Sequence, residues 1–204
     1  MKFVLFVEGH TEKSLSHFLK RWLDPRLPKP VGIQVVRFDG WGNYAKEIAK
    51  KVELHLSGRS GEQIIGAVGL LDLYGPDFYP AQEREANARY RWAKQHFEGL
   101  VAHPKFRQHF AVHEVEAWLL ADHGLSPNEV LRALPPRCGQ PEQINFSEPP
   151  KRLLNRLFHE KLHRNYKEVT DGTNLFQRLK PETVYEKCPY FKLLLDDMLK
   201  LASA

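Results

Sequence analysis

The sequence predicts an α/β fold with a largely parallel sheet of about four strands, flanked by helices and followed by a helical C-terminal part. Between residues 3 and 122, apolar runs typical of strands alternate with stretches of helical periodicity. This alternation is typical of parallel sheets whose faces are covered by helices. Apolar residues make up 42% of the 204 residues and charged residues 27%, a balance that excludes wholesale disorder.

Four segments carry a strand pattern. The first, Phe3 to Val7, is a continuous apolar run, as expected for a strand buried on both faces. The other expected strands are residues 33–38, 64–71 and 106–112. Helical periodicity or helix-start signals mark residues 11–23, 43–56, 81–99 and 114–122.

The alternation of strand and helix patterns ends after Asp122. Residues 135–150 contain five prolines, which predicts a loop, and residues 151–204 have helical periodicity. The pair Cys188-Pro189 is expected to mark the start of the last helix. We therefore expect an α/β core over residues 1–134 and a helical extension over residues 135–204, packed together as one compact unit.

Composition indicates the cellular compartment and the type of partner to expect. The net charge of +5 slightly favours a polyanionic partner. The two cysteines, Cys138 and Cys188, form no CxxC motif, which favours reduced thiols in a cytosol. The apolar run at residues 3–7 is too short for a signal peptide, and no run approaches the ~18–20 residues of a membrane span. The expectation is a soluble, cytoplasmic protein with no membrane partner.

Acidic residues follow three of the four expected strands. Glu8 follows the first strand, Asp72 the third, and Glu114 and Glu116 the fourth. The carboxyl ends of parallel strands meet at one edge of the sheet, where open sheets bind ligands. Gathered carboxylates repel one another unless a cation compensates them, and their oxygens suit Mg²⁺ or Mn²⁺. The pattern predicts a metal site, made by these four acids, that acts on a phosphate.

Each acid also has a structural interpretation. Glu8 can cap the helix that follows it, since acids are favoured at helix N-termini. Asp72 can stabilise the turn at residues 74–76. Glu114 and Glu116 fall in the first turn of an expected helix, where acids are common without any catalytic duty. The expectation that all four acids lie at the same edge of the sheet is what favours a metal site over these separate structural roles.

Basic residues are concentrated between Lys151 and Lys167. Lys151, Arg152, Arg156 and Arg164 are candidates for contacts to a nucleic-acid backbone, and Lys167 or Arg152 for neutralising charge on a phosphate. A solvated helix face is the alternative. The turn Gly40-Trp41-Gly42 is a weaker phosphate candidate. The sequence contains no GxxxxGK[ST], GxSxG or HExxH, which disfavours a P-loop, a serine hydrolase and a zinc hydrolase.

Several short motifs, in this order, resemble the DUF4276 family over nearly the whole chain. They are FVEGHTE at residues 6–12, GWG at 40–42, LDLYG at 71–75, HEVEAWLLAD at 113–122, PKRLL at 150–154 and EKCPYF at 186–191. That family is similar to the Toprim domains of topoisomerases, primases and OLD-type nucleases. The resemblance therefore implies a Toprim-like fold and Mg²⁺-dependent chemistry at a phosphodiester.

The resemblance also implies roles for individual residues. Glu8 matches the Toprim glutamate after the first strand, and Asp72 matches the first acid of the DxD motif. Tyr74 stands where the second DxD acid would be, so a one-metal or a non-catalytic site is also open. Glu114 or Glu116 would complete the metal ligands or act as a general base.

Two functions follow as expectations. The first is a Toprim-like metal-dependent nuclease or phosphodiester-processing protein that acts on DNA or RNA in prokaryotic defence. The alternative is a non-catalytic subunit that binds nucleic acid or an ATPase partner protein. The acids at three strand ends favour the enzyme, and the missing second DxD acid favours the alternative.

Overall fold

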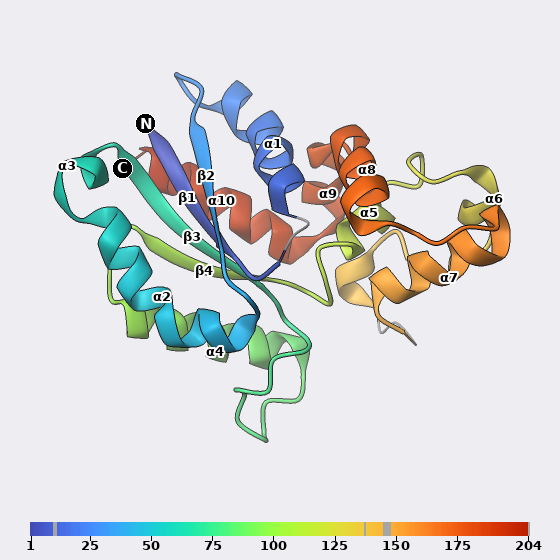
Figure 1. Cartoon of the computed structure of the whole chain (residues 1–204), viewed down its shortest axis with the longest axis horizontal. Coiled ribbons are helices and arrows are strands. Elements are labelled where there is room, and N and C mark those ends of the chain that lie inside the picture. Colours follow the sequence, from blue (N-terminus) through green and yellow to red (C-terminus); the bar gives the residue numbers. More distant parts are fainter. Residues whose placement is uncertain (10–11, 137, 145–147, 204) are drawn as a thin grey trace.

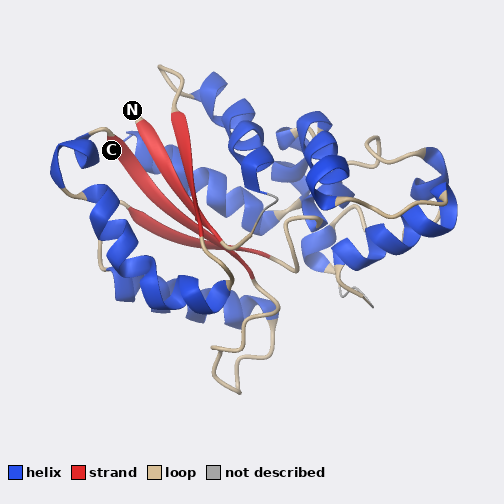
Figure 2. Ribbon diagram, in the orientation of Figure 1, coloured by secondary structure: helices blue, strands red, loops and turns tan. Residues whose placement is uncertain are grey.

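Four parallel strands form a sheet in the order β2-β1-β3-β4 (Figures 1 and 2). The order confirms a parallel α/β fold and places β1 and β3 in the centre. Each predicted strand is present and ends within about a residue of its expected limits. The strands are β1 (Lys2–Val7), β2 (Gly32–Arg37), β3 (Ile64–Asp72) and β4 (Phe106–Ala111).

The computed structural model describes residues 1–9, 12–136, 138–144 and 148–203, and it leaves the side chains of residues 12, 13 and 60 undescribed. The first residue of the helix expected at residues 11–23 lies outside these residues, as do parts of the loop expected at residues 135–150. Most helices follow the predicted periodicity. The helices are α1 (Glu12–Leu23), η1 (Asp24–Arg26), α2 (Trp41–Leu56), α3 (Gly58–Glu62), α4 (Ala86–Val101), α5 (Ala117–Ala121), α6 (Asn128–Leu131), η2 (Pro141–Gln143), α7 (Pro150–Leu162), η3 (Glu168–Gly172), α8 (Thr173–Arg178), α9 (Pro181–Lys187) and α10 (Pro189–Ser203).

Helices cover both faces of the sheet. Along β1 the side chains alternate between two buried clusters, because successive residues of a strand point to opposite faces. Phe3 and Leu5 pack with α1 and α10, whereas Val4 and Phe6 pack with α2 and α4. Figure 1 shows α1 and α10 on one side of the strands and α2 and α4 on the other.

The C-terminal helices share the core of the sheet. Leu194 and Leu195 of α10 are fully buried, in the same cluster as Phe3 and Leu5. Cys188, immediately before α10, is a buried free thiol, and α10 begins at Pro189 as expected. The boundary expected near residue 134 stays a prediction.

Two helix predictions are wrong at their starts. Residues 81–85 are not helical: α4 begins at Ala86, because the chain first turns back at Pro80 and is extended at Glu85. Residues 114–116 form a turn before α5, because their carbonyls accept hydrogen bonds from the N–H groups three residues further on, instead of four as in an α-helix. The segment 151–204 is mostly helical, but it is broken at residues 163–167, 179–180 and 188.

Candidate functional site

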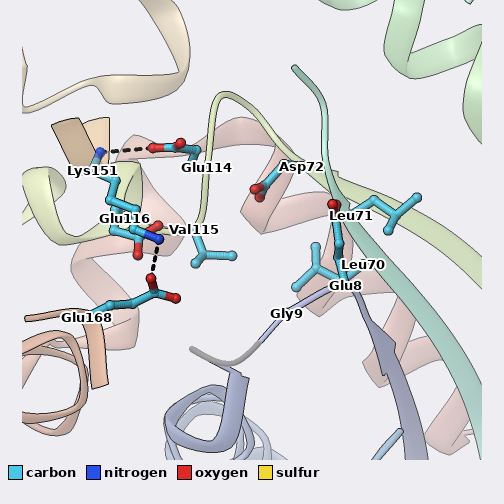
Figure 3. A pocket seen from close by; sticks show the side chains of 10 residues that line it. All are labelled: Glu8, Gly9, Leu70, Leu71, Asp72, Glu114, Val115, Glu116, Lys151 and Glu168. Atoms are coloured by element: carbon cyan, nitrogen blue, oxygen red, sulfur yellow. Dashed lines mark hydrogen bonds and ion pairs between the residues drawn. The ribbon is translucent and has the colours of Figure 1, made fainter. Parts of the chain in front are cut away.

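A cleft of about 160 Å³ lies at the carboxyl edge of the sheet. It brings together all four acids that the sequence predicted for a metal site (Figure 3). Two residues from the C-terminal part complete its polar lining, Lys151 from the first turn of α7 and Glu168 from η3. The charged residues that line the cleft are Glu8, Asp72, Glu114, Glu116, Lys151 and Glu168.

Glu8 and Asp72 come from the two central strands. Val7 pairs with Leu70, so β3 continues two residues further and ends at Asp72, beside Glu8 at the same edge. Burial raises the pKa of Glu8 from its ordinary value, while a hydrogen bond from the backbone N–H of Trp41 acts in the opposite direction. Glu8 therefore contacts the N-terminus of α2, a helix later in the chain than the one it was expected to cap. Its expected capping of α1 stays a prediction, because the start of that helix lies partly outside the described residues.

Glu114 and Glu116 enter the cleft from the turn between β4 and α5. The Oε2 atom of Glu114 accepts a hydrogen bond of 2.9 Å from the backbone N–H of Lys151 (Figure 3). Glu116 is only 3% exposed, and its Oε1 atom has no hydrogen-bond partner among the described residues. Burial raises the pKa of Glu116 from 4.5 to about 7. Desolvation is the main cause of this shift, and the attraction of the Lys151 cation offsets it only in part.

The sequence had not indicated that Lys151 and Glu168 belong to the cleft. The ammonium group of Lys151 forms an ion pair with Glu168 across the wall of the cleft (Figure 3). The sequence pattern places Lys151 on a basic surface and gives no signal for Glu168. The prolines at positions 149 and 150 were a usable signal for Lys151, since proline favours the first turn of a helix.

The other basic residues are arranged differently from a continuous phosphate track. Arg156 is paired with Glu148 at 2.7 Å and with Glu160 at 3.2 Å, and Arg164 is paired with Asp171 at 2.8 Å. These cations are therefore already largely neutralised by acids.

Lys167 and Arg152 were the predicted neutralisers of phosphate charge. Lys167 is exposed, and it is not among the described residues that line the cleft. Arg152 is also exposed and lines a neighbouring hollow instead.

The residues near Tyr74 do not supply a second DxD acid. Tyr74 stacks on His113, with ring centroids 5.2 Å apart and an interplanar angle of 15°. Asp77, the next acid along the chain, is exposed. In the turn before α2, Gly40 has a φ of +86°, which explains the glycine at that position.

The donor set is suited to a hard cation, but the acids are spread over the cleft. Within the described part of the chain, no three His, Cys, Asp or Glu side chains lie close enough together to hold a metal ion. Carboxylate side chains would have to rotate towards one another to share a cation. The predicted Mg²⁺ or Mn²⁺ site therefore stays a prediction.

The parallel sheet and the acids at its strand ends define an open-sheet α/β protein with an acidic cleft at the carboxyl edge. The chain belongs to the DUF4276 family, a domain of unknown function whose family model matches residues 7–199. This match confirms the family resemblance read from the motifs. No curated protein matches the chain significantly.

Solved structures with a similar fold include C-terminal regions of OLD proteins. That of the Burkholderia pseudomallei OLD protein is 20% identical, with 98% of each chain covered and a TM-score of 0.49. That of the Xanthomonas campestris pv. campestris OLD protein is 19% identical, with 98% of this chain and 93% of that chain covered and a TM-score of 0.48. In the described residues, no helix has the length and apolar character needed to cross a bilayer.

Proposed function

We propose that this protein is a metal-dependent phosphodiesterase that cleaves nucleic acid, with a role in prokaryotic defence. One observation carries the chemical part of the proposal. Carboxylates from three strand ends and a lysine from α7 line the same cleft. The defence role rests on the family resemblance of the motifs alone.

The residues of the cleft have the right chemistry for Mg²⁺ or Mn²⁺. Their oxygens are hard ligands, and the unpaired Oε1 atom of Glu116 is a buried acceptor that a cation would compensate. Glu8, Asp72 and Glu116 would hold the ion, with Glu114 near them. When bound, such a cation polarises the phosphorus centre and makes water more acidic.

The chain's own residues would bind and orient the phosphodiester. Lys151 would exchange its ion pair with Glu168 for a non-bridging phosphate oxygen and neutralise the charge that develops there. Glu114 would keep α7 in place, because it accepts the backbone N–H of Lys151. Lys151 thus takes the role that the sequence suggested for Arg152 or Lys167.

One observation favours a second candidate function. Tyr74 occupies the place of the second DxD acid and stacks on His113, so it supplies no metal ligand. A non-catalytic subunit would bind nucleic acid or an ATPase partner through the same edge of the sheet.

The test is a nuclease assay on single- and double-stranded DNA and RNA, with Mg²⁺, with Mn²⁺ and with a chelator. We expect cleavage that requires the metal and falls at least about 100-fold in Asp72→Asn. Asp77→Asn is the matched control, because it removes an exposed acid five residues away. Metal-independent cleavage, or equal activity of both variants, would contradict the proposal. Binding without cleavage would favour the non-catalytic subunit.

A further inference from the structure

A second hollow, of about 460 Å³, adjoins the acidic cleft. The two spaces share Glu114, Lys151 and Glu168 as a common wall. The other polar walls of the hollow are Arg152, Asn155 and Tyr166. A ligand that extends from the cleft past Lys151 would therefore enter this hollow.

The hydroxyl group of Tyr166 is the observation that indicates a ligand in the hollow. Its side chain is 8% exposed, and its hydroxyl group has no hydrogen-bond partner among the described residues. The ring packs edge-on against Phe158, with centroids 5.4 Å apart. The backbone N–H of Tyr166 donates to Asn155 Oδ1 at 3.1 Å. Because a buried hydroxyl without a partner is costly, its retention needs a reason, and a bound acceptor would supply one.

The hydrogen-bond donors in the hollow favour an anion as this acceptor, although Glu114 and Glu168 keep their charges. The acids of the shared wall are already engaged: Glu114 accepts the Lys151 backbone N–H, and Glu168 pairs with the Lys151 ammonium group. The groups that remain are donors, namely the Arg152 guanidinium, the Asn155 side-chain N–H₂ and the Tyr166 hydroxyl. Asn155 uses its oxygen for Tyr166, which leaves its nitrogen to donate.

We propose that the hollow is a subsite for a second phosphate of the strand, the one next to the phosphate held in the acidic cleft. This inference rests on the proposed function and deepens it, since it names the substrate class. The protein would act on polynucleotides, in which phosphates recur along the strand. A small diester with one phosphate would fill only the acidic cleft.

The test measures cleavage of two substrates by the full chain in the presence of Mg²⁺ or Mn²⁺. The substrates are a short oligonucleotide and bis(p-nitrophenyl) phosphate. In Arg152→Ala we expect the ratio of kcat/KM for the oligonucleotide to that for the small diester to fall about tenfold. Tyr166→Phe should lower the same ratio without lowering the Tm, because it removes an unpaired buried hydroxyl. Arg91→Ala, which removes an exposed arginine of α4, is the matched control.

A chemically modified substrate provides an independent measurement. A methylphosphonate next to the scissile phosphate removes one charge, so it should weaken wild-type binding about tenfold and Arg152→Ala binding less than about twofold. Equal losses in both proteins, or an unchanged substrate ratio in both variants, would overturn the subsite. A wild-type protein that cleaves neither substrate would refute the proposed function alone. In that case the methylphosphonate binding comparison still decides the subsite.

Discussion

Glu116→Gln removes the charge of the most buried acid in the cleft and nearly keeps its shape. The folded pKa of Glu116 is about 7, against 4.5 for the ordinary group. Because the folded pKa is the higher one, the contribution of Glu116 to stability is fully present below pH 4.5 and is lost as the pH rises through 7. At about 1.36 kcal/mol per pKa unit, the ionised side chain costs the folded protein roughly 3 kcal/mol.

The assay is denaturant unfolding of both proteins at pH 5 and at pH 8.5. Between these values, the stability of Glu116→Gln relative to wild type should rise by about 2 to 3 kcal/mol. The comparison across pH cancels any constant cost of the buried amide. Glu114→Gln is the control: its carboxylate already accepts the Lys151 N–H, so its loss should destabilise the protein slightly. If Glu116→Gln gains nothing at high pH, the acid is compensated and the reasoning is wrong.

Three further outcomes are expected from the remaining charged groups. Arg152→Ala should reduce the slope of log affinity for duplex DNA against log salt concentration by about 0.9. Arg156→Ala should reduce this slope by less than half as much, because Arg156 is already paired with Glu148 and Glu160. Binding titrations at several salt concentrations measure both slopes. Glu142→Ala should lower stability to denaturant by about 3 kcal/mol, since its carboxylate accepts two backbone N–H groups at the start of α10 and the indole N–H of Trp118. Burial lowers the pKa of His109 to about 4, so the wild type should lose stability as the pH falls below 6.5. In His109→Gln that loss should be shallower, and an unchanged pH profile would speak against a neutral buried histidine.

The sheet and half of the cleft could be predicted because their signals are local. Apolar runs end at Val7 and near Asp72, and the acids that follow must then share one edge. The pairs Arg156–Glu160 and Lys94–Glu98 were also readable, since they are four residues apart on one helix.

The other half of the cleft depends on contacts between distant segments. Lys151 reaches Glu114 and Glu168 only because α7 packs beside the turn after β4, and no periodicity in the sequence encodes that approach. Glu142 is a comparable case. It lies in a proline-rich stretch with no helical pattern, yet it caps α10 from a buried position. The start of α4 was missed because the charged residues 81–85 resemble a helical surface in composition.

The position of α10 affects how the protein folds while it is being synthesised. A chain leaves the ribosome with its N-terminus first, so β1 and β3 emerge well before the helix that covers one of their faces. The codons for Lys151 and Glu168 also lie far behind those for Glu8 and Asp72. A nascent chain therefore carries an acidic edge without its lysine, on a sheet with one bare face. The cleft therefore reaches its full lining only after α7 and η3 have been synthesised and α10 has packed on the sheet.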